Sequence, residues 1–371
     1  MFDQQAVKSP AAPASSRSGA LPAARTTWLA ALGAGVLMGS MILINVAVPW
    51  RPYVEGYTEK LEFFQRHGAD YSILFVGSSR ILAHVDPHIF DAAASAEGMQ
   101  GRSFNLGVDA LSLIELERLI EEVLAVGSPS LRFIFMEPTV ATSVPLRNLT
   151  TERNLYFHDL GATRLEIACN LAAYPERWLE AVSRSARSCL YHYANLGRLT
   201  SFVFPREEVI RPRGFDLDLV ASGGFRPQNH EPSPEVLREN QRMRDNLGFY
   251  VARMAAPREL PEARRFAPHA RFYIDLAERI QAKGIQPVFL ITPGFHNIDG
   301  LLEFMHMHER ADSAVPMLSY VHGYDEIYRA ELWFDPGHMK DQGARLFSRR
   351  LGRDAAHLIM RLGGASCCSS S

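Results

Sequence analysis

Hydrophobic and polar residues are distributed unevenly at the start of the chain. From Thr26 to Trp50 there is no charged residue for 25 positions, and an arginine stands on each side of this run. A helix of that length rises about 37 Å, which is enough to cross the roughly 30 Å hydrocarbon core of a bilayer. Trp28 and Trp50 lie near its ends, where aromatic side chains favour the membrane interface. The pattern predicts one transmembrane helix over residues 26–50.

The alternative for this run is a cleaved signal peptide. Its apolar region is usually about 7–15 residues long and ends in a small-x-small site. This run is longer, and Asn45-Val46-Ala47 fits such a site poorly, so we favour an uncleaved anchor. Basic residues exceed acidic ones before the run but not after it, which predicts a cytoplasmic N-terminus and a periplasmic remainder. The flanking charges are Lys8, Arg17, Arg25 and Asp3 before the run, and Arg51, Lys60, Glu55, Glu59 and Glu62 after it.

After the anchor, short apolar runs alternate with amphipathic helical patterns. This alternation predicts an α/β fold with a parallel sheet that is covered by helices on both faces. The predicted strands are 71–76, 103–106, 131–136 and 286–291, and the predicted helices are 109–126, 272–282 and 341–362. Residues 139–271 interrupt this alternation of strands and helices and contain helical patterns near 162–195 and 234–254. We interpret them as an insertion that caps the sheet. The expected organisation is a disordered cytoplasmic tail (1–25), the anchor (26–50), one α/β domain (51–362) and a flexible tail (363–371).

Composition narrows the possible partners and cofactors. Lysine plus arginine (39) nearly balances aspartate plus glutamate (41), so no basic excess favours nucleic acid. Cys169 and Cys189 either pair in an oxidising compartment or remain free thiols, while Cys367 and Cys368 lie in the Gly/Ser-rich tail. Only one histidine cluster occurs, His306-Met307-His308 with His296 nearby, and it lacks an evident third ligand. We therefore predict neither a metal site nor a cofactor.

Residues capable of chemistry follow the predicted strands, at the sheet edge where open parallel sheets bind ligands. They are Gly77-Ser78-Ser79-Arg80, Asn105-Leu106-Gly107, Glu137, and Asp335-Pro336-Gly337-His338 before the last helix. Asp335 can orient the imidazole of His338, which can then deprotonate a serine hydroxyl such as that of Ser79. The N–H groups of Ser79 and Gly107 are candidate donors to an oxyanion. For a working relay we expect Ser79 Oγ and His338 Nε2 within about 4 Å.

The order of these motifs resembles the SGNH (GDSL-type) hydrolase family. Gly77-Ser78-Ser79 matches its first block and implies that Ser79 is the nucleophile. Asn105-Leu106-Gly107 matches the second block, with Gly107 as an oxyanion donor, and Asp335 with His338 matches the last. The resemblance implies a flavodoxin-like three-layer sandwich around a central parallel sheet. The Gly-Ser-Ser variant is similar to the branch that contains envelope acyl-transfer proteins.

The third block departs from the family pattern. Where the family has an asparagine that donates to the oxyanion, this chain has Glu137, and an ionised glutamate cannot donate a hydrogen bond. Arg80 or the side chain of Asn105 could supply the missing donor. Alternatively, Arg80 forms an ion pair with Glu137 across neighbouring strand ends.

The resemblance implies a membrane-anchored, extracytoplasmic serine acyl-ester enzyme of the inner (cytoplasmic) membrane. We expect an O-acyl(acetyl)transferase or acetylesterase that acts on a cell-envelope or exported polysaccharide through an acyl-Ser79 intermediate. The implied partners are the polysaccharide acceptor and a multi-spanning membrane acyltransferase. The alternative is a non-catalytic envelope-assembly or scaffold protein that retains the fold.

Overall fold

The computed structural model describes residues 23–47, 53–139, 151–194, 215–228, 232–255, 267–295, 301, 304–306, 308–309, 315–321 and 326–363. The predictions for both tails (residues 1–22 and 364–371), for Trp50 and for His296 lie outside these residues. The chain divides into two compact units, Met1–Trp50 and Arg51–Ser371, which we describe separately.

The first unit contains one long apolar helix, α1 (Ala23–Ala47). Its span Thr26–Ile44 is long and apolar enough to cross a membrane, and only 6% of that span is buried within the protein. Leucine, valine and isoleucine side chains are exposed along its length. Such a helix is suited to an apolar surrounding, as in a membrane anchor or a signal sequence.

The second unit is an α/β domain built on a five-stranded parallel sheet, which confirms the predicted fold class. The strands are β1 (Ile73–Gly77), β2 (Ser103–Gly107), β3 (Phe133–Met136), β4 (Gln286–Ile291) and β5 (Met317–Ser319). Their order in the sheet is β2-β1-β3-β4-β5. Gly77 pairs with Gly107 and Val76 with Met136, so the carboxyl ends of β1, β2 and β3 lie together. The short strand β5 was not predicted.

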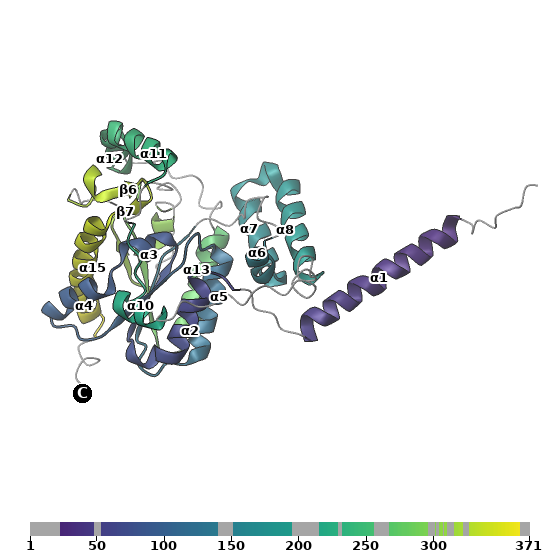
Figure 1. Ribbon diagram of the computed structural model, residues 1–371, viewed down its shortest axis with the longest axis horizontal. Coiled ribbons are helices and arrows are strands. Elements are labelled where there is room, and N and C mark those ends of the chain that lie inside the picture. Colours follow the sequence, from purple (N-terminus) through teal and green to yellow (C-terminus); the bar gives the residue numbers. More distant parts are fainter. Residues whose placement is uncertain are drawn as a thin grey trace, which may run out of the picture. The chain divides into compact units, whose positions relative to one another are not determined.

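Helices cover both faces of this sheet, as Figure 1 shows. One layer contains α2 (Tyr57–His67), α5 (Leu113–Val126) and α13 (Ala267–Gln281). The other contains α3 (Ser79–His84), α4 (Pro87–Ala96) and α15 (Asp341–Arg361). The strands β1, β2 and β3 are buried along their full length. The inner strands β1 and β3 therefore read as apolar runs, whereas the edge strand β2 contains the polar residues Ser103 and Asn105.

Local capping chemistry sets the limits of α5. Ser112 and Glu115 form a reciprocal capping box at its start, and Gly127 ends it in the left-handed conformation (φ 64°). The sequence predicted a start between Asp109 and Ser112, and the cap shows that Ser112 is the residue that begins the helix. The predicted end at Val126 is confirmed.

The predicted insertion consists of separate helices. They are α6 (Glu152–Phe157), α7 (Leu160–Ala173), the short 3₁₀ helix η3 (Pro175–Arg177), α8 (Trp178–Tyr193), α10 (Phe215–Ser222), α11 (Pro234–Asp245) and α12 (Leu247–Ala255). A break at Tyr174-Pro175 divides the predicted 162–195 pattern in two. The segment after α10 lies beside β2, and the N–H of Asn105 in β2 donates to the carbonyl oxygen of Gly223 in this segment (2.8 Å). The helix α11 packs on the strand β6 (Trp333–Asp335).

The contact between α15 and α4 depends on a glycine inside α15. A Cβ built on Gly352 would lie 2.5 Å from the carbonyl oxygen of Phe90 and 2.9 Å from the Cβ of Ala93. We expect Gly352→Ala to lower the free energy of unfolding by about 1–2 kcal/mol, because overpacking outweighs the gain in helix propensity. Gly248→Ala in α12 is the control, since a Cβ there meets nothing within 4 Å. Denaturant unfolding in detergent measures both, and a stabilised Gly352→Ala would contradict this account.

Candidate active site

The turn between β1 and α3 presents the predicted nucleophile. Ser78 is the N-cap of α3 and Ser79 its first residue. A Cβ on Gly77 would lie 2.5 Å from Cγ1 of Ile81 and 2.6 Å from Cβ of Glu137, so only glycine fits at this turn. The serine therefore stands at the carboxyl edge of the sheet because the backbone turns tightly just before it.

A short antiparallel hairpin, not predicted from the sequence, holds the other two relay residues. Its strands are β6 and β7 (His338–Met339), and Trp333 at its base is fully buried. Within the turn, Asp335 Oδ1 accepts hydrogen bonds from the N–H groups of Gly337 (2.7 Å) and His338 (2.9 Å). These bonds fix the carboxylate of Asp335 relative to the His338 ring.

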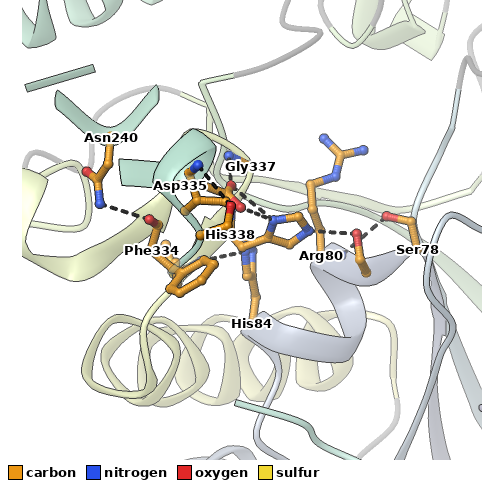
Figure 2. Close-up of polar contacts among 12 residues, drawn as sticks. Ser78, Arg80, His84, Asn240, Phe334, Asp335, Gly337 and His338 are labelled. Atoms are coloured by element: carbon orange, nitrogen blue, oxygen red, sulfur yellow. Dashed lines mark hydrogen bonds and ion pairs between the residues drawn. The ribbon is translucent and has the colours of Figure 1, made fainter. Parts of the chain in front are cut away.

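The structure brings Ser79, His338 and Asp335 into one hydrogen-bonded chain (Figure 2). His338 Nδ1 lies 2.8 Å from Asp335 Oδ2 and 3.0 Å from Oδ1, and His338 Nε2 lies 2.8 Å from Ser79 Oγ. The expected distance between the serine and the histidine is therefore confirmed. In this arrangement Asp335 accepts a hydrogen bond from the Nδ1–H of His338, which leaves Nε2 free to accept the serine proton.

The environment keeps Asp335 ionised. Burial by itself would raise the pKa of this carboxyl, but the hydrogen bond and charge of His338 and the backbone N–H donors lower it below its usual value. The side chains of His338 and Asp335 remain 26% and 16% exposed, so the relay is open to solvent on one side.

The structure corrects two of the predicted oxyanion donors. Asn105 is fully buried, and its Nδ2 donates to the carbonyl oxygens of Ile81 and Val85, both at 2.7 Å, so this amide does not face the site. The Gly107 N–H donates to Asn105 Oδ1 (2.8 Å) and is not an unshared donor. Gly107 is needed for packing instead, because a Cβ there would lie 2.3 Å from the backbone nitrogen of Leu82 in α3.

Arg80 forms an ion pair with Glu137. This pair was one of the two roles that the sequence left open for Arg80, the other being a donor to the oxyanion. Arg80 Nε lies 2.6 Å from Glu137 Oε1, and the glutamate side chain is 1% exposed. Glu137 Oε2 also accepts from the N–H and the hydroxyl of Ser78, both at 2.7 Å, and Thr292 donates to Oε1 (3.3 Å). Glu137 therefore holds the residues on either side of Ser79.

Two buried residues next to the site, His84 and Lys60, were not predicted as site residues from the sequence. His84 is fully buried; its ring centroid lies 6.4 Å from that of His338, and its Nε2 accepts from the N–H of Met339 (3.1 Å).

Lys60 of α2 is also buried and donates to the carbonyl oxygen of Gly107 (2.8 Å). Burial, followed by repulsion from Arg226, lowers the pKa of Lys60 to about 7. Lys60 and Glu59, counted from the sequence as charges flanking the membrane, thus belong to the folded interior.

The remaining candidates do not join this cluster. His308 Nε2 contacts the carbonyl oxygen of Val315 (2.7 Å), and Met307 lies outside the described residues. Within the described part of the chain, no group of three or more His, Cys, Asp or Glu residues could hold a metal ion. Cys169 and Cys189 are free, and burial raises the pKa of the Cys169 thiol to about 12.

Comparison with known proteins does not assign the chain to a family. No protein-family model matches the sequence, and no curated protein matches it either.

Removing the charge of Glu137 should weaken the fold. We expect Glu137→Gln to lower the free energy of unfolding by about 3 kcal/mol, because it leaves Arg80 without its buried counter-charge. Glu117→Gln is the matched control: Glu117 pairs with Arg279 at 2.6 Å on the surface, and its loss should cost less than about 1 kcal/mol. Denaturant unfolding of the two variants checks this, and equal losses would show that the Glu137 pair has no special structural role.

His84 should make the domain sensitive to acid. Burial, reinforced by His338 and Arg80, lowers the pKa of His84 well below its usual 6.5. Below pH 6.5 the unfolded chain therefore takes up a proton that the folded chain excludes, and stability falls by up to about 1.4 kcal/mol per pH unit. We expect His84→Gln to lose less stability than wild type between pH 7 and pH 5 in denaturant unfolding. His158, with a pKa lowered by burial to about 4, contributes to the slope of both proteins. Identical losses in the two proteins would refute the role of His84.

Proposed function

We propose that this protein is a serine acyl-ester enzyme of the SGNH type, with Ser79 as nucleophile, His338 as general base and acid, and Asp335 as the residue that orients the imidazole. The observation that carries the proposal is the hydrogen-bonded chain from Ser79 Oγ through His338 to Asp335. A serine hydroxyl is a weak nucleophile and requires such a base to attack a carbonyl carbon.

The topology supports the same assignment. The strand order β2-β1-β3-β4-β5 is the order of flavodoxin-like sheets, in which ligands bind where the strand order reverses, beside β1 and β3. Ser79 follows β1, Glu137 follows β3, and the hairpin with Asp335 and His338 precedes the last helix. These are the places where the SGNH resemblance expects the nucleophile and the final Asp-x-x-His block.

The reaction proceeds in two steps. Ser79 Oγ attacks the carbonyl carbon of an acyl ester while His338 Nε2 takes the hydroxyl proton, and His338 then returns it to the departing alcohol, which leaves acyl-Ser79. In the second step His338 deprotonates an acceptor hydroxyl, which attacks the acyl carbon, and the proton returns to Ser79 Oγ. Water as acceptor gives hydrolysis, whereas a sugar hydroxyl gives transfer.

The oxyanion of each tetrahedral intermediate requires donors near Ser79. The Ser79 N–H is one, since it has no hydrogen-bond acceptor among the described residues. Arg80 supplies a second: Glu137 occupies its Nε, and its Nη groups form no hydrogen bond within the described part of the chain. Nη1 lies 4.0 Å from a Cβ built on Gly294, on the loop after β4. A guanidinium stabilises a developing negative charge strongly where water is excluded.

We place the reaction outside the cytoplasm, at the inner (cytoplasmic) membrane, with α1 as a retained anchor. The acceptor is a hydroxyl of a cell-envelope or exported polysaccharide, and acetyl is the acyl group we favour. A multi-spanning membrane acyltransferase would bring acyl groups across the bilayer to Ser79. Transfer is slightly favoured over hydrolysis because the anchor and the Gly-Ser-Ser turn resemble those of envelope acyl-transfer proteins.

A non-catalytic scaffold of envelope assembly is the second candidate. It is favoured by one observation: the N–H of Gly107 and the amide of Asn105 are already engaged, so two expected oxyanion donors do not face Ser79. A scaffold would keep the fold and lack reactivity at Ser79.

Labelling with a fluorophosphonate probe separates these candidates without a guess of substrate. We expect the full chain in detergent to be labelled on Ser79, with labelling abolished in Ser79→Ala. Ser78→Ala is the matched control: it loses the hydroxyl bond to Glu137 but keeps the backbone N–H bond, so it should react more slowly, but still on Ser79. Mass spectrometry of the labelled peptide identifies the residue.

The enzyme proposal fails if wild type and Ser79→Ala show equally little labelling. As a second readout, wild type should release p-nitrophenol from an acetyl ester faster than Ser79→Ala, and an added glycan acceptor should accelerate a transferase.

A further inference from the structure

Helices α7 and α8 of the insertion form an antiparallel pair with an unusual distribution of polar and apolar residues. The N–H of Leu160, at the start of α7, donates to the hydroxyl of Tyr193 at the end of α8 (3.3 Å). Polar residues of α8 are buried: Ser185 Oγ donates to Glu166 of α7 (2.7 Å), and Ser188 accepts from Asn154 of α6 (3.3 Å). The buried side of this pair therefore contains several polar residues.

Several large apolar side chains are exposed on the outside of the pair. Leu179 is 65% exposed, Trp178 and Tyr174 are each 51% exposed, and Leu190 is 47% exposed. Leu179 and Leu190 are eleven residues apart on α8 and thus share one side of the helix. Leu171, at the end of α7, is exposed as well. A helix pair with serines inside and leucines and tryptophan outside is suited to an apolar surrounding.

One charged residue beside Leu179, Glu180, is paired. Glu180 accepts from Arg177 Nη2 (2.7 Å) and from Arg184 Nη2 (3.2 Å), so its carboxylate is balanced by guanidinium groups with long apolar stems. Arginine can keep its charged head in a hydrated headgroup layer while its stem lies against apolar material. Tryptophan and tyrosine favour the same layer.

The base of this helix pair lies where the chain enters the α/β domain. Tyr57, the first residue of α2, packs edge-on against Phe157, the last residue of α6, with ring centroids 5.2 Å apart. Figure 1 shows α6, α7 and α8 packed together. Ten Cα–Cα steps separate Ala47, the end of α1, from Tyr57, and even fully extended they span at most about 36 Å. If α1 crosses a bilayer, the α6–α8 group is held within reach of its surface.

We propose that the α7–α8 apolar face, defined as Leu171, Tyr174, Trp178, Leu179 and Leu190, inserts into the headgroup region of the membrane that anchors α1. This second contact, in addition to the anchor, would hold the α/β domain in one orientation on the lipid surface. The inference rests on the retained anchor of the proposed function, but not on the chemistry of Ser79.

The test asks whether the domain stays on a lipid surface after its anchor is cut. The full chain, with a protease site placed in residues 48–52, is reconstituted into vesicles of phosphatidylcholine and phosphatidylglycerol that contain no other protein. After cleavage, flotation separates bound from free domain. We expect wild type to remain bound and Trp178→Ser/Leu179→Ser to partition at least about tenfold more weakly, because two large apolar side chains no longer enter the bilayer.

Leu237→Ser is the matched control, because Leu237 is similarly exposed (53%) but lies on α11. It should stay bound like wild type. Release of the wild-type domain from the vesicles, or equal retention of the double variant, would overturn the proposal. Retention only in native membranes would overturn it in favour of a protein partner, and retention only at high protein-to-lipid ratio in favour of a second copy of the chain.

Failure of this proposal is distinguishable from failure of the proposed function. A mature chain that mass spectrometry finds without α1, before any protease is added, would overturn both the anchor and the membrane contact. Loss of fluorophosphonate labelling at Ser79 would overturn the enzyme and leave the flotation result unaffected.

Discussion

The candidate site depends on one buried carboxylate. Glu137 ends β3 and binds Ser78 through both its N–H and its hydroxyl, while its second oxygen pairs with Arg80. Ser79 lies between these two partners in the sequence and, within the described part of the chain, forms no hydrogen bond with Glu137. The glutamate therefore fixes the backbone around the serine and leaves its hydroxyl to His338. A buried charge is costly unless it is fully paired. The bonds that offset this cost are the same bonds that orient the turn. The stability of this edge of the sheet is therefore linked to the position of Ser79.

Close backbone approach is the second constraint on the site. Gly77 and Gly107 pair across β1 and β2, and a Cβ on either would collide with α3 or with Glu137. The helix that carries Ser79 can therefore sit directly on the ends of both strands. The motif glycine of β2 serves this packing, because its N–H already bonds Asn105 and its carbonyl oxygen accepts from Lys60.

The sequence predicted the parts of this structure that local patterns determine. Buried strands such as β4 read as apolar runs, and Ser112 and Gly127 marked the ends of α5 through capping chemistry. The sequence did not predict the β6–β7 hairpin, since two short strands around Pro336 carry no periodic signal. It also left the role of Arg80 undecided and placed the Asn105 amide wrongly. Those features depend on which groups meet across the sheet, and no spacing along the chain encodes such contacts.

Arg80 can pair with Glu137 and also donate to an oxyanion in this geometry, although the sequence analysis treated these two roles as alternatives. Its Nε satisfies Glu137, and a guanidinium carries further donors in the same plane that this bond does not use. The ion pair thus restricts where those donors can lie, on the same short helix as Ser79 and one residue beyond it. Under the proposed function, a fixed cation beside Ser79 would compensate for the oxyanion donors that Gly107 and Asn105 do not present. In the proposed SGNH-type enzyme, Glu137 would thus replace the asparagine of the third block indirectly: its carboxylate cannot donate a hydrogen bond, but it holds in place a guanidinium that can.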